Sequence, residues 1–489
     1  NDALNRERGD AYSFRIRGLD ELNFKHYSVM LEACNTSFQV HFQVTPEEFP
    51  RLYNIAQVAT APVLAAAVNS PLLFGRRLWA ETRIALFQQS VDTRKAGTHI
   101  REIQPRVSFG TDWIHESVLE IFREDISRFK VIIGSAIDED AFERLHAGAI
   151  PRLTALLLHN STVYRWNRPC YGITNGRPHL RIENRVLPAG PSTADEVANA
   201  AFWFGLMAGL AERYPDIRSV FAFDDAKNNF VAASRHGLDA HLAWVGGEAC
   251  TAQSLITDEL IPLAADALRD HGLNRDHIEH YFGIIDARVR SRRTGSRWIL
   301  DSLAQMERRP GAPRGEPFVA ITAATVERQL GQRPVHEWSL ATIEESGGWK
   351  HNFLVVEQFM TTDLITVNEE ESVDLVANLM DWKCIRHVPV EDGDHRLVGI
   401  VSYRRLIRHL ARSPRTGTAP PEDVPVRDIM KRDPVTIEPE TSSLEAIETM
   451  RRHGVSCLPV VSGDQLVGVV TESDFTRVAR QLLEEFLRQ

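Results

Sequence analysis

The chain has 489 residues, 43% of them hydrophobic and 25% charged, and a formal net charge of −10. This length is too great for one hydrophobic core and predicts two to four domains. The negative charge argues against nucleic acid or an anionic membrane as the main partner, and no apolar run reaches the roughly 18–20 residues that span a bilayer. Five scattered cysteines are typical of a reducing cytoplasm. The first residue is Asn1 and not Met, so we expect a processed or truncated start.

Residues 1–20 are polar, rich in arginine and without a clear element, whereas residues 34–44 alternate strictly between apolar and polar side chains. Period-two alternation predicts a half-buried strand. One face carries Phe38, Val40, Phe42 and Val44, and the other carries Asn35, Ser37, Gln39, His41 and Gln43. Amides, a hydroxyl and an imidazole bind a ligand or a metal at short range. Alternatively, the polar side lies beneath a loop or a subunit interface.

The next segments predict a helix and then a loop. Thr45, Pro46 and two acids predict a helix start, and this helix continues to about Ala67. An Asn-Ser-Pro turn and a glycine in residues 69–75 predict a loop that opens into a second helix. Arg76, Arg77 and Arg83 accompany a tryptophan there, and a guanidinium group suits a carboxylate or a phosphate. The alternative is a surface helix whose arginines pair with Glu81.

A second polar-faced strand is predicted at residues 179–186, where His179, Arg181, Glu183 and Arg185 share one face. This face is either a cross-strand ion ladder or a metal carboxylate beside a phosphate-neutralising arginine, and two such strands favour the second interpretation. A long apolar helix should follow from Ser192 to about Arg213. Five arginines then fall within residues 288–297. They predict a polyphosphate ligand or, alternatively, a surface ion-pair network.

The C-terminal third is an internal repeat. Residues 359–367 recur as 429–437, residues 387–390 as 457–460, and residues 397–402 as 466–471, at offsets of 70, 70 and 69. Each copy predicts strand, helix, strand, strand, helix, and the pair resembles a tandem cystathionine-β-synthase-type (CBS) module over about residues 355–482. The resemblance implies a regulatory module with a cleft for an adenine nucleotide (AMP, ADP or ATP). Gly468, Thr471 and Asp474 fit the ribose- and phosphate-binding motif, whereas Arg405 replaces the aspartate in the first copy. We therefore expect one adenosine site; a purely structural dimerisation module is the alternative.

Residues 34–44, 69–83, 179–191, 235–240 and 288–298 together resemble the carboxylate–amine ligase, or glutamate–cysteine ligase type 2, family. The resemblance implies a glutamine-synthetase-like fold, in which the concave face of an antiparallel sheet holds ATP and Mg²⁺ with helices behind it. It also implies ligation of an amino-acid carboxylate to an amine through an acyl phosphate.

The resemblance implies a role for each group of polar residues. His41 and Glu183 are the expected ligands of the metal or, alternatively, contacts of the phosphate. The catalytic arginines are Arg185 and Arg235 near the phosphoryl group, with Arg76, Arg77 and Arg83 for the substrate carboxylate. Further cofactor contacts are Arg288, Arg290, Arg293 and Arg297. Family members usually open with a glutamate-rich strand, and none precedes Glu32 here, since Asp20 and Glu21 are poor substitutes. Either the first segment is missing or the site is incomplete.

Together these observations predict an α+β protein. A glutamine-synthetase-like domain spans residues 1–310, a linker spans 311–353, and two α/β CBS domains span 354–415 and 424–484. We expect an ATP- and Mg²⁺-dependent carboxylate–amine ligase, regulated by adenine nucleotides and forming a homo-oligomer through the CBS pair. Its partners are a small carboxylate substrate and an amine. One alternative is a non-catalytic nucleotide sensor, and another is a metal-dependent hydrolase using His41 with His159 or His179.

Overall fold

The structure is a computed structural model and describes residues 4, 12–26, 28–92, 94, 105–137, 139–247, 249–307, 315–346, 353–362, 364–392, 396–412, 424–463 and 465–486. The chain divides into two compact units, Asn1–Ile343 and Glu344–Gln489. Within the described ranges, no helix has both the length and the apolar character that crossing a membrane requires.

The N-terminal unit contains an antiparallel sheet in the order β3 (Val40–Val44), β9 (Arg177–Asn184), β8 (Asn167–Thr174). Val40 and Val44 are buried on one face, and on the same face Phe42 meets the ring of Trp203 edge-on, with ring centroids 6.3 Å apart. On the other face His41 pairs with Glu183 across the two strands, and directly paired residues point to the same side. One face of the sheet is therefore apolar and covered, and the opposite face is polar.

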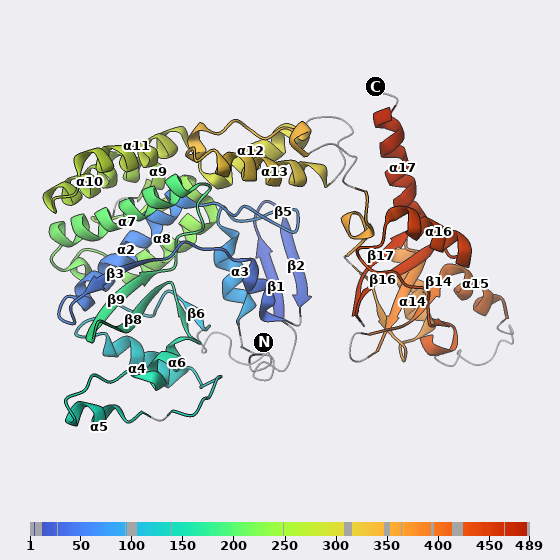
Figure 1. Ribbon diagram of the computed structural model, residues 1–489, viewed down its shortest axis with the longest axis horizontal. Coiled ribbons are helices and arrows are strands. Elements are labelled where there is room, and N and C mark those ends of the chain that lie inside the picture. The colour runs from blue at the N-terminus through green and yellow to red at the C-terminus, as the bar shows by residue number, and fades with distance from the viewer. Residues whose placement is uncertain are drawn as a thin grey trace. The chain divides into compact units, whose positions relative to one another are not determined.

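Helices cover the apolar face. α2 (Phe49–Ala67) packs against α7 (Thr193–Arg213) and α8 (Phe223–His236), and α10 (Ile261–Asp270) and α11 (Arg275–Ser291) pack against α7 (Figure 1). α7 begins as predicted, because the Ser192 side chain caps it by accepting from the backbone N–H of Asp195. Gly205 lets α10 approach α7, since a Cβ atom at Gly205 would lie 2.7 Å from the Cβ atom of Ala264.

Short elements complete the unit. The hairpins and bridges are β1 (Tyr12–Arg17) with β2 (Glu21–His26), β4 (Leu72–Leu73) with β5 (Arg76–Arg77), β6 (Val107–Ser108) with β7 (Tyr164–Arg165), and β10 (His241–Ala243) with β11 (Ala249–Thr251). The remaining α-helices are α3 (Thr82–Ser90), α4 (Leu119–Arg128), α5 (Ala141–His146), α6 (Thr154–Asn160), α9 (Ala252–Leu255), α12 (Gly295–Glu307) and α13 (Glu316–Leu330).

Three predictions of local structure need correction. The segment expected to lack structure contains strand β1, in which Tyr12, Phe14 and Ile16 are buried. The strand expected from residue 34 begins only at Val40, because residues 29–34 form a 3-10 helix capped by the Ser28 side chain. The expected linker holds α13, whose buried face joins a core with the tryptophans of residues 298 and 338; part of residues 311–353 thus belongs to the N-terminal unit.

The C-terminal unit consists of the two repeat copies. The first has β12 (Val367–Asn368), α14 (Val373–Trp382), β13 (His387–Glu391), β14 (Leu397–Ser402) and α15 (Tyr403–Arg412). The second has β15 (Lys431–Arg432), α16 (Ser443–His453), β16 (Cys457–Ser462), β17 (Gln465–Thr471) and α17 (Glu472–Phe486). β15 of the second copy pairs with β14 of the first, and Thr361 of the first copy bridges to Val469 of the second. Each copy therefore contributes its opening segment to the other.

Candidate functional site

The polar face of the central sheet carries a group of side chains that we call the polar-face cluster: His41, Arg168, Cys170, Glu183 and Arg185. The ligating atoms of its imidazole, thiol and carboxylate all lie within 4.8 Å of one another. In the described ranges, this is the one group of three or more His, Cys, Asp or Glu side chains close enough to share a metal ion. Strand pairing explains the convergence, because Glu183 lies between His41 on one neighbouring strand and Arg168 on the other. The structure thus brings the two predicted metal ligands together.

Glu183 is buried at the centre of this cluster and is 1% exposed. Its carboxylate accepts a hydrogen bond from Arg168 Nε at 2.7 Å and one from Cys170 Sγ at 3.2 Å. Arg185 Nε lies 3.7 Å from the same carboxylate. Two guanidinium groups therefore compensate one buried carboxylate, and a positive charge remains.

Arg185 is the cation in excess. Its guanidinium lies over the neighbouring rings of Phe87 and Tyr164, at 5.9 and 5.7 Å from their centroids, and burial together with the nearby Arg168 lowers its pKa. The Nη1 atom is buried, and none of the described residues accepts a hydrogen bond from it. Buried donors are normally satisfied, so this N–H group is suited to an oxygen of a bound phosphate or carboxylate.

Two neutral groups adjoin Glu183. Loss of solvation lowers the pKa of His41, and Arg181 and Arg168 lower it further, although Glu183 opposes them. Burial, with the Glu183 charge beside it, raises the pKa of the Cys170 thiol to about 11. At neutral pH the cluster therefore holds an uncharged imidazole, which is exposed, and an uncharged thiol, which is buried.

The cluster does not fit a magnesium ion. Mg²⁺ prefers an octahedron of oxygen ligands, whereas these residues offer one nitrogen, one sulfur and one carboxylate that is already paired with Arg168. A nitrogen, sulfur and oxygen set is typical of zinc and other transition metals. His41 and Glu183, the expected magnesium ligands, thus lie close together, but these described donors do not suit that ion.

Arg83 lies behind the cluster, where it fixes the backbone. It is buried in an ion pair with Glu81 at 3.3 Å, and it donates to the backbone carbonyls of Arg185 and Val186. This arginine therefore positions the segment that carries Arg185. These contacts give its predicted role at the substrate carboxylate no support.

The other predicted substrate arginines lie on the short β4–β5 hairpin. Arg77 donates to both carboxylate oxygens of Asp20, at 3.0 and 3.1 Å. Arg76 is exposed and forms no ion pair with any described residue. Arg235 is elsewhere, in a separate cavity of about 470 Å³, with its guanidinium 4.7 Å from the ring centroid of Trp79.

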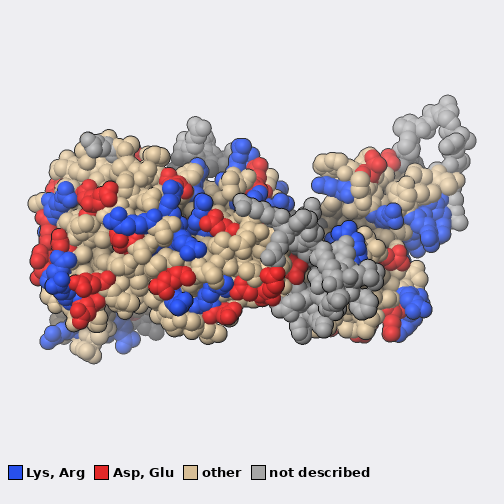
Figure 2. Space-filling view, turned by 90° about the horizontal axis from the view of Figure 1, so that it is seen from above, with Lys and Arg blue, Asp and Glu red and all other residues tan. Residues whose placement is uncertain are grey.

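The arginines of residues 288–297 do not converge on one position. Arg288 is buried and donates to Asp195 at 2.7 Å. Arg290 pairs with Asp286 and Arg297 with Asp301, each four residues apart on its helix. Arg293 donates to the backbone carbonyl of His336, and Arg292 pairs with Asp239. Figure 2 shows Lys and Arg interspersed with Asp and Glu over the visible face of the N-terminal unit. An ion-pair network, the alternative expectation, describes most of this segment. Arg292 and Arg297 also line the cavity that holds Arg235, so a role in ligand binding stays a prediction for them.

The histidines of the hydrolase alternative also lie apart. His159 Nε2 bonds the backbone carbonyl of Phe129 at 3.0 Å, and His179 Nε2 bonds the hydroxyl of Thr174 at 3.0 Å. Neither joins His41 in the metal-ligating group of the described residues. This arrangement gives the hydrolase interpretation no support.

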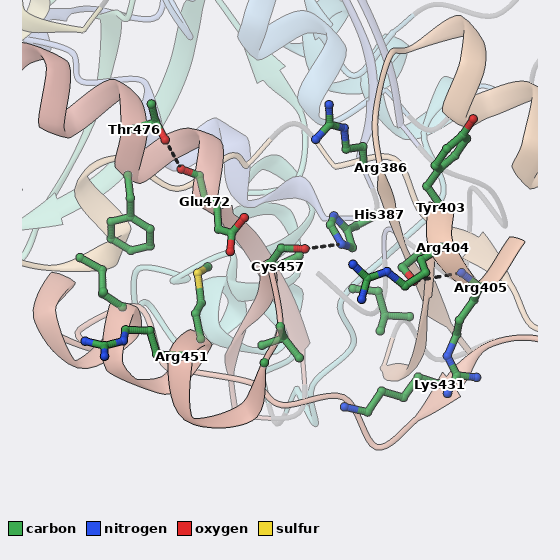
Figure 3. A pocket seen from close by; sticks show the side chains of 18 of the residues that line it. Arg386, His387, Tyr403, Arg404, Arg405, Lys431, Arg451, Cys457, Glu472 and Thr476 are labelled. Carbon is green, nitrogen blue, oxygen red and sulfur yellow. Dashed lines mark hydrogen bonds between the residues drawn. The ribbon is translucent and has the colours of Figure 1, made fainter. Parts of the chain in front are cut away.

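The C-terminal unit contains a second candidate site, a cleft of about 1230 Å³ lined by both repeat copies (Figure 3). We call it the CBS cleft. Basic side chains from the first copy and from β15 line it, together with apolar side chains of α16 and α17. His387 lies between the two groups, where its Nε2 atom bonds the Ser456 hydroxyl at 3.2 Å. Burial, with Arg386 beside it, lowers the pKa of His387.

The predicted nucleotide motif has structural roles beside this cleft. The Asp474 carboxylate accepts from the Thr471 backbone N–H at 2.9 Å and from its hydroxyl at 2.8 Å, which caps the start of α17. A Cβ atom at Gly468 would lie 2.4 Å from the Met360 sulfur, so close packing between the copies requires glycine there. In the first copy, Arg405 donates to two backbone carbonyls of the second copy's opening segment.

Comparison with known proteins agrees with this organisation. The profile of glutamate–cysteine ligase family 2 matches residues 15–316, more than half of the chain. The chain belongs to that family. The CBS domain profile matches residues 356–412 and 426–480, so the ligase-family domain is joined to a tandem CBS pair.

Individual relatives match short parts of this chain. An inosine-5′-monophosphate dehydrogenase of Korarchaeum cryptofilum is 38% identical over 119 residues, which are 24% of this chain and 23% of that enzyme. A CBS domain-containing protein of Dictyostelium discoideum is 33% identical over 27% of this chain and 94% of its own length. The crystal structure of CBSX2 in complex with AMP is 27% identical over 26% of this chain and 98% of that chain, with a TM-score of 0.23. The chain spans about a quarter of the dehydrogenase and of the homoserine O-acetyltransferases that it also matches.

Sequence reasoning missed two members of the polar-face cluster. Cys170 and Arg168 lie on β8, which pairs with β9 along eight residues. β8 contains Pro169 and Gly172, two residue types that are uncommon inside strands, so the sequence gave no clear strand signal. The only signal in the sequence is a pair of polar residues around a proline, beside the well-marked strand at residues 179–186.

Proposed function

We propose that this chain is an ATP-dependent carboxylate–amine ligase that forms an amide through an acyl phosphate, and that its CBS pair binds an adenine nucleotide. Membership of glutamate–cysteine ligase family 2 supports a ligase-type enzyme. The observation that carries the finer proposal is the buried Nη1 atom of Arg185, which lacks an acceptor among the described residues. An anionic oxygen of the phosphoryl group or of the substrate carboxylate supplies that acceptor.

ATP supplies the phosphoryl group that converts the carboxylate to an acyl phosphate, from which amine attack releases phosphate. In this reaction the protein mainly positions groups and neutralises charge. Arg185 binds the anionic oxygens, and Glu183 holds the guanidinium groups of Arg168 and Arg185 in place through its own contacts. The neutral imidazole of His41 accepts the proton that the attacking amine loses.

The predicted roles divide under this proposal. Arg185 and Glu183 remain at the reacting groups, and Arg83 acts through the backbone. Arg76, which pairs with no acid among the described residues, is available to a substrate carboxylate, whereas Arg77 is held by Asp20. Arg235 belongs to a different cavity. Mg²⁺ is assigned no step, because the described donor set does not suit it.

The test measures ADP release from ATP while single amino acids and acid–amine pairs are scanned. Arg185→Gln removes the unpaired donor, and Arg177→Gln, an exposed position at the other end of the strand β9 that leads to Arg185, is the matched control. We expect substrate-dependent ADP release that falls at least tenfold in Arg185→Gln and is unchanged in Arg177→Gln. Equal turnover in both variants would refute the assignment of Arg185.

A non-catalytic nucleotide sensor is the second candidate. Glu183 is the only carboxylate of the polar-face cluster, and Arg168 and Arg185 already compensate its charge. This pairing favours the sensor, because it leaves the cluster no free carboxylate for a metal ion. If ATP binds to the chain, no acid–amine pair drives ADP release, and substitutions in the CBS cleft abolish ATP binding, the sensor is the correct interpretation.

Two further predictions belong to this proposal. We place the protein in the cytoplasm, and we expect copies to associate through the CBS pair. Trp382 on α14 and Leu444 on α16 are each 76% exposed, so both offer apolar surface for such association. Sedimentation of a Trp382→Ser, Leu444→Ser double variant tests the second prediction, which expects a shift to a smaller species.

A further inference from the structure

The charges that line the CBS cleft are distributed unequally. Five basic side chains and one acid, Glu472, lie on its surface. The basic residues are Arg386, Arg404, Arg405, Lys431 and Arg451. None of them forms an ion pair with any residue in the described part of the chain, although many arginines of the N-terminal unit do. Unpaired cations that converge on a cavity bind anions.

Comparison of the two repeat copies accounts for one of these positive charges. Arg405 stands 69 residues before Asp474, the offset that relates these parts of the two copies. In the second copy the aspartate lies in the first turn of α17 and caps the start of that helix through Thr471. In the first copy the arginine donates instead to the carbonyls of Ile429 and Met430, at 3.1 Å each. The first copy therefore lacks the carboxylate that would accept hydrogen bonds from ribose hydroxyls. It has the guanidinium of Arg405 at that position of the cleft instead.

The cleft is also divided by polarity. Four of the cations come from the first copy's side chains and from Lys431, and Figure 3 shows the labelled Arg404, Arg405 and Lys431 on the side of the pocket away from Arg451. Ile447 and Met450 of α16, with Phe475 of α17, supply an apolar wall from the second copy. A volume of about 1230 Å³ exceeds the roughly 300–1,000 Å³ of ordinary small-molecule sites. There is space for an apolar ring at one end and several phosphates at the other.

We propose that the first copy's end of the CBS cleft is a polyphosphate subsite. The cleft then selects a nucleoside triphosphate or diphosphate over the monophosphate and over the uncharged nucleoside, with the base against the α16–α17 wall. This inference rests on the proposed function in one respect, since it takes the ligand of the cleft to be an adenine nucleotide. It adds that the first copy recognises phosphate where the second recognises the nucleoside.

The experiment measures binding calorimetrically on the full chain, in an Arg185→Gln background that disables the anion position of the ligase domain, and in EDTA to remove divalent cations. Adenosine, AMP, ADP, ATP and inorganic tripolyphosphate are the ligands. The test variant is Arg404→Gln with Lys431→Gln. The matched control is Arg408→Gln with Arg452→Gln, two exposed arginines on α15 and α16 that do not line the cleft.

We expect ATP to bind at least tenfold more tightly than AMP, and the test variant to lose most of that difference. Adenosine affinity changes less than threefold in the test variant, tripolyphosphate competes with ATP, and the control behaves as the parent. Raising the salt concentration weakens ATP binding to the parent far more than to the test variant, because the removed charges no longer contribute. Unchanged thermal unfolding of the test variant shows that the substitutions act on binding.

Two results overturn the inference, and they are distinguishable. If ATP and AMP bind equally and the test variant matches its control, the polyphosphate subsite is refuted while nucleotide binding stands. If no adenine ligand binds the parent, the nucleotide-binding part of the proposed function fails and the inference fails with it.

Discussion

The buried ion pair between Arg288 and Asp195 allows a sharp test of what the arginine-rich segment does. Asp195 is fully buried, and its carboxylate accepts from Arg288 at 2.7 Å and from the backbone N–H of Val335 at 3.0 Å. Arg288 also donates to Asn199 and to the carbonyl of Ala66. The pair therefore joins α2, α7, α11 and the segment after α13. Replacing Arg288 by Met keeps the apolar stem and leaves an uncompensated carboxylate in the core.

Breaking a buried pair from one side costs about 3–5 kcal/mol. Unfolding entropy is about 2.1 cal/mol/K per residue, so over Asn1–Ile343 this cost lowers the Tm of the N-terminal unit by roughly 4–7 °C. Scanning calorimetry of the full chain measures that shift. Arg290→Met, which removes an exposed arginine of the same helix, is the control, and we expect its Tm to equal that of the parent.

A second variant tests the cause. Asp195→Asn keeps the acceptor for Val335 and removes the charge, so the Arg288→Met, Asp195→Asn double variant should unfold at a higher temperature than Arg288→Met alone. If Arg288→Met leaves Tm unchanged and weakens ATP binding, the arginine serves a ligand, and its structural role in the core is refuted.

Three further predictions concern single sites. Because the pKa of Cys170 is raised to about 11 by burial, we expect a thiol reagent at pH 8 to modify the exposed Cys34 at least roughly 100-fold faster, as peptide mass spectrometry would show; comparable rates would contradict this. The pKa of His387 is lowered in the folded chain, so as the pH falls the unfolded chain protonates this imidazole before the folded chain does. The free energy of unfolding of the C-terminal unit should therefore fall as the pH drops below about 6.5. In denaturant titrations, His387→Gln should flatten that slope. Gly205→Ala gains about 1 kcal/mol of helix propensity, but its Cβ atom would lie 2.8 Å from the backbone oxygen of Ala264, so we expect a net loss of about 1–3 kcal/mol and a lower Tm; a higher Tm would show that α10 moves freely.

The sequence predicts best where one periodic signal dominates. The strand at residues 179–186, the helix from Ser192 and the internal repeat all appear close to the expected positions, because alternation, capping and repetition are local properties. Strand β1 has the same alternation, with Tyr12, Phe14 and Ile16 buried, but its exposed face carries arginines that obscured the pattern. The helix α13 was missed within the expected linker, and its apolar face is stabilised by tertiary packing with residues outside that segment.

Arginine clusters show the limit of sequence reasoning most clearly. Arg185 and Arg288 both occur in dense polar segments, and composition alone does not separate them. The difference is whether an acid from a distant segment reaches the guanidinium. Asp195, 93 residues away, pairs with Arg288 alone among the described arginines, whereas Arg185 shares Glu183 with Arg168 and lies 3.7 Å from it. Partners set by the fold decide which arginine is available to a ligand.

The net charge of the polar-face cluster determines whether it favours an anion or a cation as a ligand. His41 and Cys170 are uncharged at neutral pH, Glu183 contributes one negative charge, and Arg168 and Arg185 contribute two positive ones, which leaves one positive charge. In a partly buried setting, where an uncompensated charge is costly, an anion lowers the energy of this cluster and a bare divalent cation raises it. We therefore predict that an anion is the first ligand that these residues bind. Exchanging Arg168 for Gln would remove the surplus, and with it the affinity for phosphate, while Glu183 would still be paired with Arg185.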